Sequence, residues 1–277
     1  GTVLTGCSSF TFPFFQTSST STTTIPATLP DTRSGTVTFD DADYSSFSSY
    51  RSATYDLDVD SYNDVLISTR DVIRHSNIMI TSTLFEITSL PWGDMKNSVA
   101  VSEGSGVVFK EDDTYYYVLT NYHVIDPETY SAEYMIKAYG DDTYQEAEIV
   151  VGSDSLDLAV LRFEKNDRSG ISLMDITTRT YTKFTQGEMV LAVGNPLSLE
   201  NNVTFGEFIS METIQNYDYD VIYHNASIHE GSSGGALVDV DGNLLGLNTW
   251  GIADSDEYSF SIPNYIIYIF LLNSGLI

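Results

Sequence analysis

The sequence contains one cysteine, Cys7, in 277 residues. No intramolecular disulfide can form, so packing and hydrogen bonds must stabilise the fold. The sequence also has no apolar run of about 18 residues, the length that a transmembrane helix needs. The nearest candidate, 262–272, is too short. Pro263 near its start and Gly275 after its end instead predict a terminal helix over about 263–275, packed on a core.

Basic residues are also scarce. Lys and Arg total 12 against 39 Asp and Glu, which gives a formal net charge of -27. This balance excludes nucleic acid and anionic lipid surfaces as partners, because both would be repelled. It identifies no substrate, and it is equally explained by solubility. Hydrophobic residues make up 42% of the chain, enough for a sizeable core.

The composition of the N-terminal segment predicts a flexible tether. Leu4-Thr5-Gly6-Cys7 resembles a bacterial lipobox, in which the cysteine is diacylated and becomes the mature N-terminus. Most of such a leader would precede residue 1. A Ser/Thr-rich linker over 16–36 follows, too polar to bury apolar surface. We therefore expect 1–36 to be a tether and the protein to be an extracytoplasmic, bacterial cell-surface lipoprotein that meets the membrane only through Cys7. An unmodified cysteine is the alternative.

Residues 37–77 form an acidic, Tyr-rich extension, with apolar spacing over 65–73 that predicts a short helix. Alternating aspartates from Asp56 to Asp60 suggest the start of a calcium loop. However, Ser61 and Ile67 stand where such a loop needs Gly and Glu. We expect no metal site.

From residue 78 onward, short β-type runs alternate with turn residues and predict an all-β domain over 78–277. Two six-stranded antiparallel barrels, over about 78–170 and 180–262, are the expected architecture. Asp241-Gly242 predicts a two-residue hairpin. The first set of runs is 78–87, 106–109, 115–120, 146–151 and 158–163, and the second is 189–193, 203–210, 221–227, 236–240, 244–249 and 258–262.

The segment Gly231-Ser232-Ser233-Gly234-Gly235 has the features of an acyl-transfer nucleophile. Its glycines permit a tight turn that exposes the Ser233 hydroxyl and aims the N–H groups of Gly231 and Ser233 at a developing oxyanion. A structural Gly/Ser loop would look the same.

A serine nucleophile needs a base and a carboxylate. Of the four histidines, His123 follows the β-rich run 115–120, at a strand end where active-site residues gather. His229 is close to Ser233 in sequence, but the base of a triad usually comes from another segment. Asp157 heads the apolar run 158–161, although position alone does not distinguish it from a turn residue.

Together these segments resemble the HtrA/Deg family of trypsin-like serine proteases. The resemblance covers about 78–277 and implies a double β-barrel with His123, Asp157 and Ser233 as a triad in the cleft between barrels. The matching motifs occur in family order: Ser105-Gly106-Val107-Val108-Phe109, Leu119-Thr120-Asn121-Tyr122-His123-Val124, Asp157-Leu158-Ala159-Val160-Leu161, Val193-Gly194-Asn195-Pro196, Val203-Thr204-Phe205-Gly206, Gly246-Leu247-Asn248-Thr249 and Phe260-Ser261-Ile262-Pro263.

The chain departs from the family in three places. Ser232 replaces the usual Asn or Asp, and Asn225 replaces an acidic residue. Most relatives continue into a PDZ domain, and we expect none in these residues. The resemblance places Ile228, Thr249 and Ile252 around the S1 pocket, which predicts cleavage after small or medium aliphatic residues.

The expected activity is a serine endopeptidase that forms an acyl-enzyme on exported or misfolded proteins, without a cofactor. Its partners would be protein or peptide substrates, and a homotrimer is the expected assembly by analogy with relatives. The alternatives are a catalytically weak, chaperone-like surface protein with the protease fold, or an acidic adhesin that uses its N-terminal region.

Overall fold

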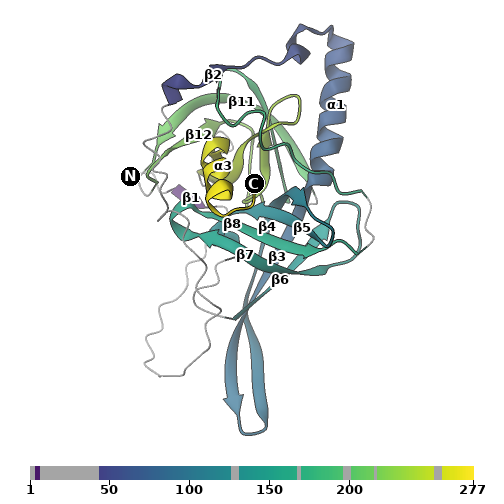
Figure 1. Ribbon diagram of the computed structural model, residues 1–277, viewed down its shortest axis with the longest axis vertical. Helices are drawn as coiled ribbons and strands as arrows, with labels where there is room; N and C mark the ends of the chain where they lie inside the picture. Colours follow the sequence, from purple (N-terminus) through teal and green to yellow (C-terminus); the bar gives the residue numbers. More distant parts are fainter. Residues whose placement is uncertain are drawn as a thin grey trace.

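The computed structural model describes residues 4–6, 44–125, 131–166, 170–195, 201–214, 217–252 and 258–277. Over these residues the chain forms two closed antiparallel β-barrels, one above the other in Figure 1. The all-β class and the pair of six-stranded barrels expected from the sequence are confirmed.

Six strands of the described chain close the first barrel in the order β3, β4, β5, β8, β7 and β6. Alternate side chains of each strand point inward, as the period of two requires. Ile78, Val118, Ile136 and Leu161 are among the side chains that fill its interior. The strands are β3 (Asn77–Leu90), β4 (Gly93–Glu111), β5 (Tyr115–Thr120), β6 (Ser131–Ala138), β7 (Gln145–Ser153) and β8 (Leu158–Glu164).

The second barrel closes because β14 pairs with both β13 and β15, so that six strands of the described chain form a ring. Val190, Ile222, Leu237 and Leu245 belong to its core. A short strand, β1 (Leu4–Gly6), adds to β14. The ring consists of β10 (Met189–Gly194), β11 (Asn202–Thr213), β12 (Asp220–His224), β15 (Ser259–Pro263), β14 (Leu244–Ile252) and β13 (Ala236–Val238).

The connection from β13 to β14 is longer than the two-residue hairpin predicted at Asp241-Gly242. The carboxylate of Asp239 accepts hydrogen bonds from the N–H groups of Asp241 and Asn243, at 3.0 and 2.9 Å. These bonds hold a wider loop, in which Gly242 has a positive φ of 84°. The Asp239 carboxylate thus accepts the backbone hydrogen bonds that carbonyl groups of a paired strand would accept in a tight hairpin.

The first hairpin is much longer than the sequence suggests. The runs 78–87 and 106–109 are parts of β3 and β4, which stay paired out to Leu90 and Gly93. Their far halves project from the barrel as a two-stranded arm (Figure 1). Both faces of this arm are largely exposed. It therefore lacks the alternation of buried and exposed residues by which a strand is recognised in a sequence.

Helix α1 (Val59–Ser76) lies before the first barrel and is longer than the 65–73 segment with apolar spacing. Asp58, part of the rejected calcium-loop pattern, caps it by accepting a hydrogen bond from Ser61 N at 2.9 Å. The hydroxyl of Thr69 donates to Val240 O at 2.8 Å, which ties the helix to the second barrel.

The segment 44–57, which we call the strap, crosses the second barrel. It contains η3 (Tyr44–Ser46), β2 (Ser48–Ser49) and η4 (Ala53–Asp56), and β2 pairs with β9 (Thr182–Lys183). The hydroxyls of Tyr44 and Tyr55 accept hydrogen bonds from Phe184 N and Met189 N, at 2.8 and 3.1 Å. The strap is therefore bound to the barrel by specific polar contacts as well as by packing.

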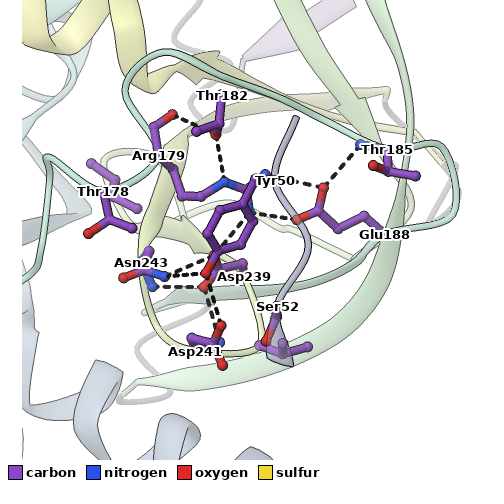
Figure 2. Close-up of polar contacts among 12 residues, drawn as sticks. Tyr50, Ser52, Thr178, Arg179, Thr182, Thr185, Glu188, Asp239, Asp241 and Asn243 are labelled. Carbon is purple, nitrogen blue, oxygen red and sulfur yellow. Dashed lines mark hydrogen bonds and ion pairs between the residues drawn. The ribbon is translucent and has the colours of Figure 1, made fainter. Parts of the chain in front are cut away.

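Beneath the strap lies a buried ion cluster (Figure 2). The Arg179 side chain is fully buried and pairs with Glu188 at 2.6 Å and Asp239 at 2.9 Å. The ring of Tyr50 covers the guanidinium, 4.1 Å from its centroid, and the Tyr50 hydroxyl donates to Asp241 at 3.0 Å. The cluster joins the residue before β10 to the residue after β13, two strands that pair with each other in the second barrel.

The chain ends in helix α3 (Asn264–Asn273), which follows β15 directly and packs on the second barrel (Figure 1). After it, the carbonyl of Leu276 accepts a hydrogen bond from Lys110 of the first barrel at 2.7 Å. The helix and the residues after it thus contact both barrels. None of the helices in the described ranges is long and apolar enough to span a membrane.

Candidate active site

Asp157 occupies an uncommon backbone conformation between η5 (Asp154–Leu156) and β8. Its φ and ψ are 53° and 41°, in the left-handed region that residues other than glycine rarely adopt. Its N–H donates to Asp154 O at 3.0 Å, and the side-chain amide of Asn121 donates to its carbonyl at 3.0 Å. Such conformations persist where surrounding bonds enforce them, and they cluster at functional sites.

His123 lies in the short helix α2 (Tyr122–Ile125), just after β5. Its Nδ1 is 2.9 and 2.8 Å from the two carboxylate oxygens of Asp157, and its backbone N–H donates to Oδ1 at 3.0 Å. Because a carboxylate only accepts, the proton belongs on Nδ1 and the lone pair on Nε2. The structure therefore brings two of the three predicted triad residues together, joined through Nδ1.

The Asp157 carboxylate has a further neighbour, Tyr217, which no sequence motif indicates. The Tyr217 hydroxyl lies 3.4 Å from Oδ2, and its ring packs edge-on against Trp250. Burial, and then the charge of Asp157, raise the pKa of Tyr217 well above its usual value. It therefore stays protonated as a donor. With 19 tyrosines in the chain, nothing in the sequence distinguishes it.

The segment 229–235 carries the predicted nucleophile Ser233, and we call it the nucleophile loop; it begins with a tight turn. Ser232 N donates to His229 O at 2.9 Å, and Gly231 has a φ of 93°. Glu230 has a negative φ and Gly231 a positive one. The turn from His229 to Ser232 is therefore of type II, which favours glycine at its third residue. Asn248 of β14 accepts from Gly234 N and donates to Gly235 O, both at 2.8 Å. The backbone of the loop is thus fixed on both sides of Ser233.

The Ser233 hydroxyl donates to the carbonyl of Thr249 at 2.8 Å. This bond turns the third predicted triad member toward β14. The two segments meet at Gly104. A Cβ built on Gly104 would lie 2.6 Å from Val124, the residue after His123, and 3.4 Å from Ser233 O.

Two of the predicted S1 residues can be located. Ile228 is buried in the core of the second barrel, and Thr249 is buried beside Ser233. A Cβ built on Gly251 would lie 3.9 Å from the Ile228 side chain, an ordinary contact distance, so the two residues are neighbours. Ile252 ends β14, and its side chain is not among those described.

His224 is fully buried, and burial lowers its pKa to about 3. Its Nε2 is 3.0 Å from the hydroxyl of Ser261, which donates to Asn248 Oδ1 at 3.1 Å. Because the only Ser261 proton is used in that bond, His224 must donate from Nε2. This series of hydrogen bonds ends at Asn248, whose backbone groups bind Gly234 and Gly235 of the nucleophile loop.

Cys7, the predicted lipidation site, lies outside the described residues. Within the described part of the chain, no three His, Cys, Asp or Glu side chains gather as a metal ion would require.

A family model described as a trypsin-like peptidase domain matches residues 104–247. The serine protease Do-like HtrA of Bacillus subtilis is 33% identical over 195 residues, which cover 66% of this chain and 41% of that protein. The serine endoprotease DegS of Escherichia coli is 38% identical over 174 residues, covering 58% and 44%. This chain spans less than half the length of these relatives.

Among solved structures, that of the serine endoprotease from Yersinia pestis superimposes with a TM-score of 0.56 and 26% identity. The alignment covers 73% of this chain and 64% of that one.

Proposed function

Because the chain belongs to the trypsin-like peptidase domain family, we propose that it is a serine endopeptidase with His123, Asp157 and Ser233 as its triad. The observation that carries the proposal is the pair of contacts, at 2.8 and 2.9 Å, between His123 Nδ1 and the Asp157 carboxylate. A histidine held in this tautomer presents Nε2 as a base, and a carboxylate in this position stabilises the imidazolium that forms.

In this mechanism the Ser233 side chain rotates from the Thr249 carbonyl toward the imidazole. His123 then takes the hydroxyl proton as Oγ attacks the peptide carbonyl, and the same proton passes to the leaving amine. Water, activated by His123, hydrolyses the acyl-enzyme and restores the serine. The N–H groups of Gly231 and Ser233 stabilise the oxyanion in both steps, and the type II turn at Gly231 supports this role.

The proposed substrates are exported or misfolded proteins, cleaved after small or medium aliphatic residues. Ile228, Thr249 and Ile252 form the proposed S1 pocket. The location of Ile228 beside Gly251 supports an apolar wall without a charged group. Profiling with a peptide library tests this specificity, and a preference for Lys, Arg, Asp or Glu before the scissile bond would refute it.

The decisive experiment replaces Ser233 by Ala. The variant should lose both casein hydrolysis and covalent labelling by a fluorophosphonate. Ser232→Ala is the matched control, because it removes the adjacent hydroxyl and should still be labelled. Undiminished labelling of Ser233→Ala would rule out the assignment.

A second candidate function is a chaperone-like surface protein with little turnover. The hydrogen bond from Ser233 to Thr249 O favours it, because that bond competes with activation by His123. Binding of unfolded casein by a protein that no fluorophosphonate labels would support this function over the first.

We also propose that the protein is an extracytoplasmic lipoprotein anchored through Cys7 and that it assembles as a homotrimer. The lipobox-like motif supports the anchor. Intact-mass analysis of the natural protein tests for a diacylglycerol group, and light scattering measures the number of subunits. An unmodified Cys7 or a monomeric mass would contradict the respective proposal.

A further inference from the structure

Ser105, in β4 of the first barrel, contacts the nucleophile loop of the second barrel at two points. Its hydroxyl donates to Gly231 O at 2.8 Å, and its backbone N–H donates to Ser233 O at 2.8 Å. The residue is fully buried. It therefore holds carbonyl groups on both sides of Ser232 from a separate rigid element.

The direction of the Ser105 hydroxyl proton is fixed by its other contacts. Oγ accepts hydrogen bonds from the backbone N–H of Asn195 at 2.9 Å and from its side-chain amide at 3.0 Å. That amide also donates to Ile78 O, while Asn195 Oδ1 accepts from Asn201 N, each at 3.0 Å. With both lone pairs of the hydroxyl occupied, its single proton is committed to Gly231 O.

The Gly231 carbonyl belongs to the peptide group between Gly231 and Ser232. The N–H end of the same group donates to His229 O at 2.9 Å, so both ends of this peptide are held. The proposed oxyanion donors, the N–H groups of Gly231 and Ser233, belong to the two adjoining peptide groups. An uncompensated change of ψ at Gly231 or of φ at Ser232 would displace the central peptide and reorient the two donors relative to each other, and the glycine at 231 offers little steric resistance to such a change.

We propose that Ser105 is a positioning residue, whose hydroxyl holds the Gly231 peptide so that both oxyanion donors point at the reacting carbonyl. This inference rests on the proposed function. It predicts that the hydroxyl matters more for the transition state than for substrate binding, because the oxyanion exists only in the former.

The test is Ser105→Ala, measured by the labelling rate with a fluorophosphonate and by kcat and KM on a peptide substrate. Losing one buried hydrogen bond should slow labelling and kcat by about tenfold, with KM changed by less than about twofold. Thr69→Val is the matched control. It removes another buried hydroxyl that donates to a carbonyl at 2.8 Å, at the contact of α1 with Val240, and should leave both rates unchanged.

Equal rates in Ser105→Ala and wild type, or equal losses in Ser105→Ala and Thr69→Val, would overturn the inference. If Ser105→Ala does not fold, Ser105→Cys preserves the volume with a weaker donor. It should then show reduced kcat with unchanged KM, and a wild-type kcat would overturn the inference. Failure of the proposed function is separately visible, because then either the wild type would not be labelled at all or Ser233→Ala would still be labelled.

Discussion

The side-chain amide of Asn121 donates a hydrogen bond to the backbone carbonyl of Asp157 at 3.0 Å. The same amide lies 3.2 Å from the hydroxyl of Thr249, in the second barrel. One buried group thus holds the left-handed backbone of Asp157 and links it to the strand that receives the Ser233 hydroxyl.

Asn121→Ala should therefore reduce both stability and kcat. Loss of these bonds should cost about 1 to 3 kcal/mol of unfolding free energy, and release of Asp157 should misalign His123. Urea unfolding and steady-state kinetics provide the two measurements. Asn264→Ala removes a comparable buried amide, bonded to Ile176 O and Leu244 O, and should lower stability while sparing kcat. A wild-type kcat in Asn121→Ala would contradict the prediction.

Asp157→Asn tests the carboxylate itself. The amide keeps one acceptor but gains a donor, so it favours the wrong tautomer of His123. We expect kcat to fall by about 10³ to 10⁴-fold, with a nearly unchanged urea midpoint. Asp154→Asn, at the start of η5, is the control and should retain activity. A kcat within tenfold of wild type in Asp157→Asn would remove this residue from the triad.

His224 should make the protein sensitive to acid. Its pKa is lowered from 6.5 in a model peptide to about 3 by burial, so the folded protein excludes a proton that the unfolded chain binds. Stability is therefore complete above pH 6.5 and is lost as the pH falls toward 3, by about 1.4 kcal/mol per pH unit.

His224→Gln, whose amide can still donate toward Ser261, should flatten this dependence between pH 6.5 and 4. Urea unfolding across that range measures the slope. His75→Gln removes a histidine outside the second barrel and serves as the control. Parallel pH profiles for His224→Gln and wild type would show that His224 is not the source.

The Arg179 cluster should dominate the stability of the second barrel. Arg179→Met leaves two buried carboxylates without their cation and should cost about 3 to 5 kcal/mol. Arg162→Met breaks a well-exposed pair with Glu148, and a change within about 1 kcal/mol is expected. Urea unfolding compares the two, and equal losses would contradict this account. Adding Asp239→Asn to Arg179→Met should recover part of the loss, because it removes one uncompensated charge.

The barrels could be predicted from the sequence because short β-type runs are separated by turn residues. Several of these runs, such as Tyr115–Thr120 and Met189–Gly194, are apolar and buried along almost their whole length. His123, Asp157 and Ser233 could be selected because each stands at the end of an apolar run or in a glycine turn, in an order that matches a known family. The far half of the β3–β4 hairpin was missed because neither of its faces is buried.

The parts of the site that escaped prediction depend on contacts distant in the sequence. Ser105 looked like the start of a strand, and nothing local indicates that its hydroxyl reaches Gly231. Tyr217 and Asn248 are likewise ordinary residues until the barrel closes. The rotamer of Ser233 is set by Thr249 O, a backbone group that no motif encodes.

The strap has a consequence for the order of events during synthesis. Tyr50 and its partner Asp241 are 191 residues apart, so the strap leaves the ribosome long before its binding surface exists. At about 5 to 20 residues per second the delay is roughly 10 to 40 s. Throughout that interval the tyrosines of the strap have no barrel to cover. Because Arg179 is sealed only when the strap docks, this early segment should be among the last to reach its final position.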